Sequence, residues 1–143
     1  MREAAKFPIQ SMIGKLWWLA HISRPDIYTA VHKVACWQNK PSKQLLKHIT
    51  HIEYLNYTPE YGIVYQKAPL SDYQVRAFCD SNFATENEYK SRLGYFFFLG
   101  NSLISWKSQI STRVMTSSTE AECHALYHTG KENVWLREFF RAF

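Results

Sequence analysis

The chain has 143 residues and carries 17 Lys and Arg against 12 Asp and Glu, a formal net charge of +5. Hydrophobic residues make up 46% of it, which is enough for the core of one domain and excludes a disordered chain. The three cysteines, Cys36, Cys79 and Cys123, lack C-x-x-C spacing, which argues against a disulfide framework or a zinc finger and predicts buried free thiols.

The positive charge is concentrated toward the N-terminus, where eight basic residues and four acidic ones precede Tyr61. This balance is compatible with a phosphate backbone as partner but is common among proteins that bind none. The apolar run 12–20 is too short to span a bilayer, contains Lys15 and is not followed by a cleavage site. We therefore expect a soluble chain of the cytoplasm or nucleus, without membrane association.

Three helices are predicted before the first strand. Apolar residues at helical spacing predict one helix over 10–21. A second begins near Pro25, with Ser23 as its capping residue and Asp26 favoured by the helix dipole. A third, of roughly four turns, follows the break at 39–42; its apolar residues are Leu45, Ile49, Ile52 and Leu55.

A basic stripe lies along this third helix and consists of Lys40, Lys43, Lys47 and His51. A nucleic-acid groove would explain it, but the residue pattern alone favours an ordinary solvated face. After it, residues 57–62 predict a turn and 63–66 a short strand, and 67–73 has the composition of a linker. We place the domain boundary there, giving a helical segment 1–66 and a second domain 67–143.

The second domain is predicted to contain three strands and a helix. The run 74–79 alternates polar and apolar residues and predicts a strand that ends at Asp80. The runs 94–99 and 102–106 predict a hairpin, joined by a two-residue turn of the primed type at Gly100-Asn101. The aromatic run 95–98 is predicted to pack in the core rather than to stack on bases.

The helix is predicted to begin at a capping box formed by Ser117 and Glu120. Glu122 then falls in line with a mostly apolar stripe, Ala125, Leu126, Thr129, Asn133 and Leu136. Two interpretations of this glutamate stay open, an exposed residue at the edge of the stripe and a metal ligand beside Asp80. His124 and His128 lie four residues apart without a third ligand nearby, so we read them as surface or packed histidines.

Four of these runs, Cys79–Ala84, Gly94–Gly100, Ser102–Trp106 and Ser117–Glu122, resemble in sequence and order the ribonuclease H region of copia-type retrotransposon Pol polyproteins. Upstream, residues 13–16, 24–27 and 30–31 are similar to the segment that follows the reverse transcriptase palm in those polyproteins. The resemblance covers nearly the whole chain. It implies a mixed α+β chain, in which a helical thumb-like segment precedes three antiparallel strands and the first helix of a ribonuclease H-like fold.

The resemblance also implies a site. Asp80 matches the first catalytic aspartate and Glu122 the catalytic glutamate of the family, which binds Mg²⁺ and cleaves the RNA strand of an RNA/DNA hybrid. Hybrid or template-primer duplex is therefore the expected partner, together with the remaining segments of a polyprotein. The family's third and fourth carboxylates have no counterpart before Phe143, Asn82 replaces a frequent second aspartate, and the polymerase Tyr-x-Asp-Asp motif is absent.

These departures lead us to expect a truncated, catalytically inactive relic. Two alternatives stay open, a repurposed non-catalytic module that binds nucleic acid or a partner protein, and a ribonuclease completed by another chain. A sheet of only three strands is also expected to leave an open edge, where a fourth strand would pair.

Overall fold

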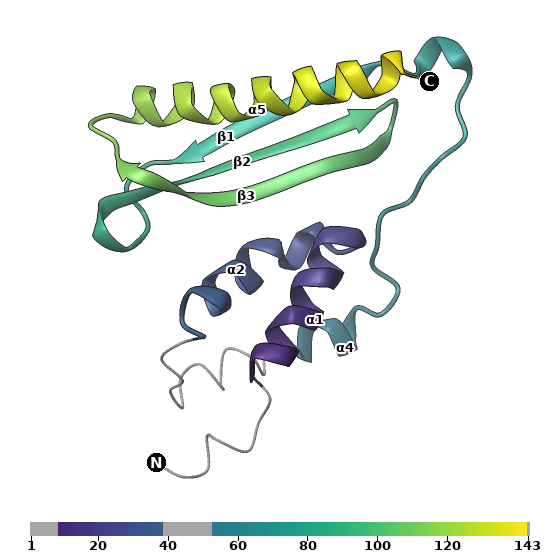
Figure 1. Cartoon of the computed structure of the whole chain (residues 1–143). Coiled ribbons are helices and arrows are strands. Elements are labelled where there is room, and N and C mark those ends of the chain that lie inside the picture. Colours follow the sequence, from purple (N-terminus) through teal and green to yellow (C-terminus); the bar gives the residue numbers. More distant parts are fainter. Residues whose placement is uncertain (1–8, 39–52, 143) are drawn as a thin grey trace. The chain divides into compact units, whose positions relative to one another are not determined.

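The computed structural model describes residues 9–38 and 53–142, and the chain divides between Ile63 and Val64 into two compact units (Figure 1). The first unit is helical, and the second is a three-stranded antiparallel sheet with a helix packed on it. The predicted mixed α+β fold class is confirmed. The domain boundary proposed between 66 and 67 stays a prediction.

The helical unit contains α1 (Ile9–Ile22), a 3₁₀ turn (Pro25–Ile27), α2 (Tyr28–Cys36) and α4 (Glu53–Tyr57). The first two predicted helices are confirmed, and their apolar faces meet in a core formed by Ile9, Ile13 and Val34. Of the third predicted helix, only the end within α4 is described. The basic stripe Lys40, Lys43, Lys47 and His51 lies outside the described residues.

A buried arginine joins the helices of this unit. The guanidinium of Arg24, only 4% exposed, forms an ion pair with Asp26 at 2.8 Å and donates to the carbonyl and the hydroxyl of Thr58, each at 2.8 Å. Tyr54 of α4 donates to the same Asp26 carboxylate. The predicted cap by Ser23 is wrong, because Arg24 occupies the capping position and no side chain caps this turn.

The second unit contains β1 (Val75–Asn82), β2 (Lys90–Leu99), β3 (Ser102–Val114) and α5 (Ser118–Arg141), with the strands in the order β1-β2-β3. The three predicted strands and the hairpin are confirmed, and each strand is longer than predicted. Gly100 has a φ of +60°, which the first position of a primed turn requires. The strand predicted at 63–66 is wrong, because the chain is irregular from Gly62 to Pro69.

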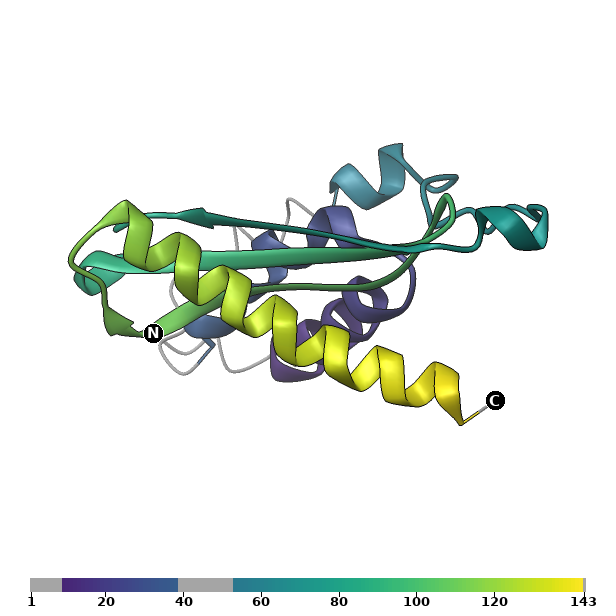
Figure 2. The same ribbon diagram turned by 90° about the horizontal axis from the view of Figure 1, so that it is seen from above.

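The two faces of the sheet differ, because side chains alternate along each strand. On one face, Cys79, Tyr95 and Phe97 pack against α5, which crosses the strands obliquely (Figure 2). On the other, Phe78 and Phe96 stay 56% and 47% exposed. The prediction that the whole aromatic run packs in the core is therefore half wrong, since four consecutive residues of a strand cannot all point to one side.

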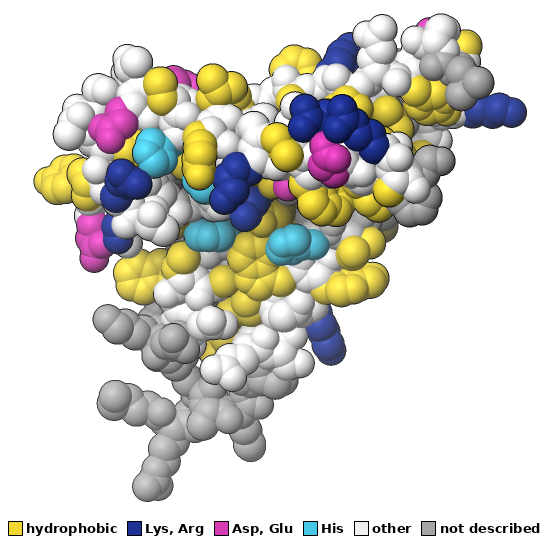
Figure 3. All heavy atoms as spheres, turned by 45° about the horizontal axis from the view of Figure 1, so that its top comes forward, with side chains coloured by type: hydrophobic (Ala, Val, Ile, Leu, Met, Phe, Trp, Pro, Cys, Tyr) yellow, Lys and Arg dark blue, Asp and Glu magenta, His cyan; other side chains and the backbone are white. Residues whose placement is uncertain are grey.

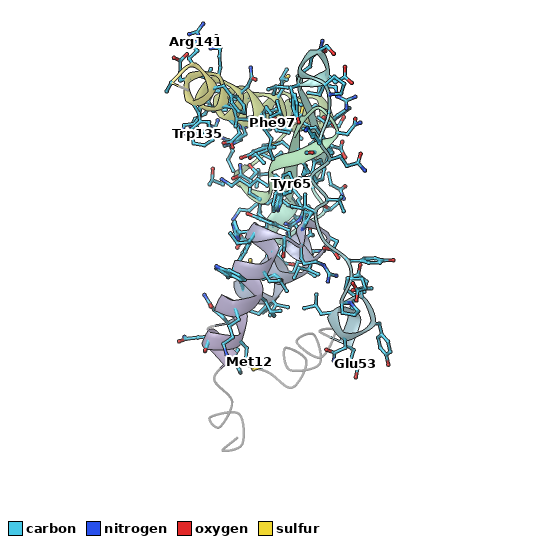
Figure 4. All side chains as sticks on the ribbon, turned by 90° about the vertical axis from the view of Figure 1, so that its right-hand side faces the viewer. Met12, Glu53, Tyr65, Phe97, Trp135 and Arg141 are labelled. Atoms are coloured by element: carbon cyan, nitrogen blue, oxygen red, sulfur yellow. The ribbon has the colours of Figure 1, made fainter. Side chains whose placement is uncertain are left out.

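Small residues let α5 lie close to the sheet. Ala121 and Ala125 pack against Leu93 and Met115, and further along Leu136 packs against Phe97. Phe97 lies on the side of the sheet that faces α5 (Figure 4). The predicted cap is confirmed, since the hydroxyl of Ser117 accepts from the amide of Glu120 at 3.1 Å. The Glu120 carboxylate accepts in turn from the amide and hydroxyl of Thr116, which lowers the pKa of that carboxyl.

The buried stripe of α5 is Ala121, Ala125, Thr129 and Leu136. The predicted stripe was therefore wrong for Leu126, which is 63% exposed, and for Asn133, which is also exposed. Other large apolar side chains of this helix, such as Val134 and Trp135, are also exposed. Hydrophobic side chains are visible at the surface in the space-filling view (Figure 3). The unit therefore presents apolar surface beyond what its own core uses.

An ion pair lies on the face of the sheet that points away from α5. The Nε atom of Arg92 donates to the Glu86 carboxylate at 2.6 Å, and the side chains are 10% and 13% exposed. A second nitrogen of Arg92 donates to Ser108, whereas its Nη2 is buried without a hydrogen-bond partner among the described residues. This pair joins the loop before β2 to the neighbouring strands β2 and β3.

The cysteines are free, as predicted, but only Cys79 is partly buried, whereas Cys36 and Cys123 are exposed. The expectation of buried thiols is therefore wrong for both exposed ones. Within the described ranges, no helix is long and apolar enough to cross a membrane.

The Arg24 pair predicts acid sensitivity of the helical unit. The hydrogen bond from Arg24 holds the pKa of Asp26 below its ordinary value. Stability from this shift is present above the unfolded pKa and is lost as pH falls through the folded pKa. Asp26→Asn should destabilise the unit by about 2 kcal/mol near neutral pH, because it removes a hydrogen-bonded charge, and by much less in acid.

Urea unfolding followed by circular dichroism at the two pH values measures this difference. Asp72→Asn, an exposed carboxyl of the other unit, is the control and should leave the helical unit unchanged. An Asp26→Asn penalty that persists undiminished in acid would contradict the assigned ion pair.

Candidate functional site

Asp80 lies in β1, two residues before the strand ends at Asn82, and is paired with Gly94 of β2. The predicted position at the strand end is thus approximately right. Its neighbours Cys79 and Ser81 face α5, and because β1 pairs with β2 without a register shift, Asp80 points to the opposite face. The carboxylate is exposed, so it is available to a ligand.

Glu122 lies in the second turn of α5 and is also exposed. Its Oε1 accepts a hydrogen bond from the hydroxyl of Ser81 at 2.9 Å. The structure therefore brings Glu122 next to β1, one residue along the strand from Asp80, and places it at the margin of the buried stripe. Sequence reasoning missed Ser81, although its position beside Asp80 and the alternation of the strand were signals that it faces the helix.

The two carboxylates therefore lie on either side of the same strand. β1 is an outer strand of the sheet, and among the described residues nothing pairs with its free edge. An ion held by both carboxylates would have to lie at this edge, because the strand itself separates the two faces. The edge of β1, together with Asp80, Ser81 and Glu122, is the candidate site.

The donor set suits Mg²⁺, which prefers oxygen ligands and is commonly held by one or two carboxylates, with water and substrate phosphates completing the octahedron. Asp80 and Glu122 are the residues that would hold it, and Ser81 would orient Glu122. When bound, such an ion activates water and stabilises a leaving oxygen in phosphodiester hydrolysis. No group of three or more His, Cys, Asp or Glu arranged to bind a metal occurs in the described part of the chain.

The two histidines of α5 lie on a different side of the helix. Burial is the main cause of a lowered pKa of His128, followed by the positive charges of Lys107 and Lys131. These cations also repel a metal ion. The arrangement agrees with the interpretation of His124 and His128 as surface or packed histidines.

Comparison with known proteins gives relatives of two kinds. Over 129 residues the chain is 33% identical to the retrovirus-related Pol polyprotein from transposon RE1 of Arabidopsis thaliana, which covers 89% of this chain and 9% of the polyprotein. It is also 33% identical over 139 residues to that from transposon TNT 1-94 of Nicotiana tabacum, covering 96% of this chain and 10% of that protein. The chain thus spans about a tenth of these relatives.

A relative of similar size is the Secreted RxLR effector protein 161 of Plasmopara viticola, 32% identical over 133 residues, which cover 90% of this chain and 91% of that protein. No family model matches the chain, and no solved structure matches it. The chain therefore belongs to a family that includes this short protein and is homologous, over most of its length, to the Pol polyproteins of copia-type retrotransposons.

Proposed function

We propose that the chain corresponds to the part of a copia-type Pol polyprotein that joins the end of the reverse transcriptase to the start of the ribonuclease H. In this assignment the helical unit is thumb-like, and β1 to β3 with α5 are the first strands and first helix of the ribonuclease H-like domain. The observation that supports it best is the placement of Glu122 beside β1 through Ser81, one residue from Asp80. Ser81 and Glu122, which are 41 residues apart in the sequence, thus meet beside one strand.

We further propose that this stretch on its own does not hydrolyse an RNA/DNA hybrid. Two-metal catalysis requires both ions to be held about 3.5–4 Å apart. Asp80 and Glu122 approach the edge of β1 from its two faces, so together they suit a single ion whose other ligands are water or phosphate. The hybrid or a template-primer duplex remains the ligand that the proposal assigns to the ancestral protein.

A second candidate is a non-catalytic module that binds nucleic acid or a partner protein. It is favoured by the Plasmopara viticola relative, since a protein consisting almost entirely of this stretch exists without the rest of a polyprotein. Hybrid binding that weakens steeply with salt would favour nucleic acid as the ligand, because phosphate contacts release counterions.

The first test addresses hydrolysis. The full chain is incubated with an RNA/DNA hybrid and Mg²⁺ or Mn²⁺, beside Asp80→Asn prepared in the same way. We expect no turnover above background from either protein, because one incomplete ion site does not stabilise both the attacking and the leaving oxygen. Cleavage that Asp80→Asn abolishes would overturn the proposal, whereas cleavage by both proteins identifies a contaminating nuclease.

The second test addresses the metal. Without Mg²⁺, Glu122→Gln should change stability by no more than about 0.5 kcal/mol, because glutamine still accepts from Ser81 and the site is exposed. With Mg²⁺, ligand binding to the folded state should raise the melting temperature of the native chain by a few degrees and leave Glu122→Gln unshifted.

The matched control is Glu138→Gln, an exposed carboxyl farther along α5, which should keep the Mg²⁺ response. Thermal unfolding with and without Mg²⁺ measures all three proteins. If Mg²⁺ shifts none of them, the assignment of Asp80 and Glu122 as metal ligands fails.

A further inference from the structure

The outer edge of β1, with which nothing among the described residues pairs, lacks two features that commonly protect an outer strand, namely a proline and a β-bulge. Residues 75–82 contain no proline and no bulge, and the register with β2 is unbroken. The register shifts of this sheet lie between β2 and β3. A regular edge of this length presents backbone donors and acceptors to another strand.

We propose that β1 pairs in antiparallel orientation with β1 of a second copy of this chain, with Phe78 at the two-fold axis. The pairing would create a continuous six-stranded sheet from two three-stranded ones. It is independent of the proposed enzymatic ancestry, because it rests only on the edge of β1 and on the side chains that this strand carries.

The alternation of faces limits the possible registers. Residues opposite each other in a pair of strands point to the same face of the sheet. Arg76, Phe78 and Asp80 point away from α5, whereas Ala77 and Cys79 point toward it. If both apolar cores are to lie on the same face of the joined sheet, each residue must therefore face one with the same side-chain direction. The two-fold axis of the pair then passes through a residue of β1, and not between two residues.

Charge then selects one centre. A two-fold axis at Arg76 or at Asp80 places that residue directly opposite its own copy, so two like charges meet. An axis at Ala77 or at Cys79 places a charged residue opposite Phe78. Centred on Phe78, Arg76 of each copy lies opposite Asp80 of the other, so opposite charges meet twice. Opposite-charge and aromatic pairs across strands are stabilising, and like charges directly opposite are not.

Exposed apolar surface lies where this pairing would cover it. Phe78 is 56% exposed and would lie beside its own copy at the axis. Leu126, 63% exposed, lies one turn after Glu122 and therefore on the side of α5 that faces β1. A two-fold axis perpendicular to the sheet places both copies of α5 on the same face of the joined sheet. The sides of the two helices that carry Leu126 then face each other.

The test is a charge exchange, measured by sedimentation of the full chain with EDTA present so that Asp80 carries no metal. The native chain should form a dimer. Asp80→Arg and Arg76→Asp should each weaken it about tenfold or more, because each creates two pairs of like charges. The double variant should restore the dimer, since the opposite charges then meet in exchanged positions.

Arg76 also donates to the carbonyl of Gly100 at 2.7 Å, so its replacement alone can weaken the hairpin. Asp80→Arg leaves that contact intact and tests the interface separately. Arg113→Asp, an exposed charge reversal on β3, is the matched control and should leave the dimer unchanged. A native chain that stays monomeric, or a dimer that survives both single reversals, would overturn the proposal.

A cross-link tests the register itself. In a chain whose cysteines are replaced (Cys36→Ser, Cys79→Ala and Cys123→Ser), Phe78→Cys should form an intermolecular disulfide on mild oxidation, because opposite residues at a two-fold axis lie within disulfide range. Val114→Cys, at the exposed end of β3, should not. Equal cross-linking at both positions indicates random collision and rejects the register.

Discussion

The close approach of α5 to one face of the sheet is the contact on which the second unit depends. Ala121 and Ala125 have side chains small enough for the helix to lie directly over Leu93 and Cys79. This contact fixes which side chains of β1 face the helix, and it therefore decides that Ser81 meets Glu122 while Asp80 points away. The geometry of the candidate site is a consequence of core packing and not of the carboxylates themselves.

Elements defined by neighbouring residues were predictable from the sequence. The hairpin at Gly100, the cap at Ser117 and the first two helices all depend on local patterns. Contacts between distant residues were not predictable, such as Arg24 with Thr58, 34 residues away, or Ser81 with Glu122, 41 residues away. The strand predicted at 63–66 failed because β-like composition forms a strand only where a partner strand is available.

The difference between local patterns and contacts of distant residues also explains how much of the candidate site could be predicted. Asp80 and Glu122 were identified through the resemblance of the motifs around them, and helix periodicity placed Glu122 near a buried stripe. Which flank of the stripe it occupies depends on the rotation of α5, and this is set by packing.

The edge of β1 has two proposed uses that exclude each other. When Asp80 pairs with Arg76 of a second copy, its carboxylate is not free to hold a metal ion.

The buried pair of Arg92 and Glu86 limits how this sequence can change over evolutionary time. Replacing either residue alone breaks the ion pair and keeps the other charge in a largely buried position, which costs several kcal/mol, whereas replacing both with apolar residues of similar volume is often neutral. The two positions are therefore epistatic, and a lineage that loses one must pass through a poorly folded intermediate to lose the other. In related sequences, these two positions should be retained together or replaced together.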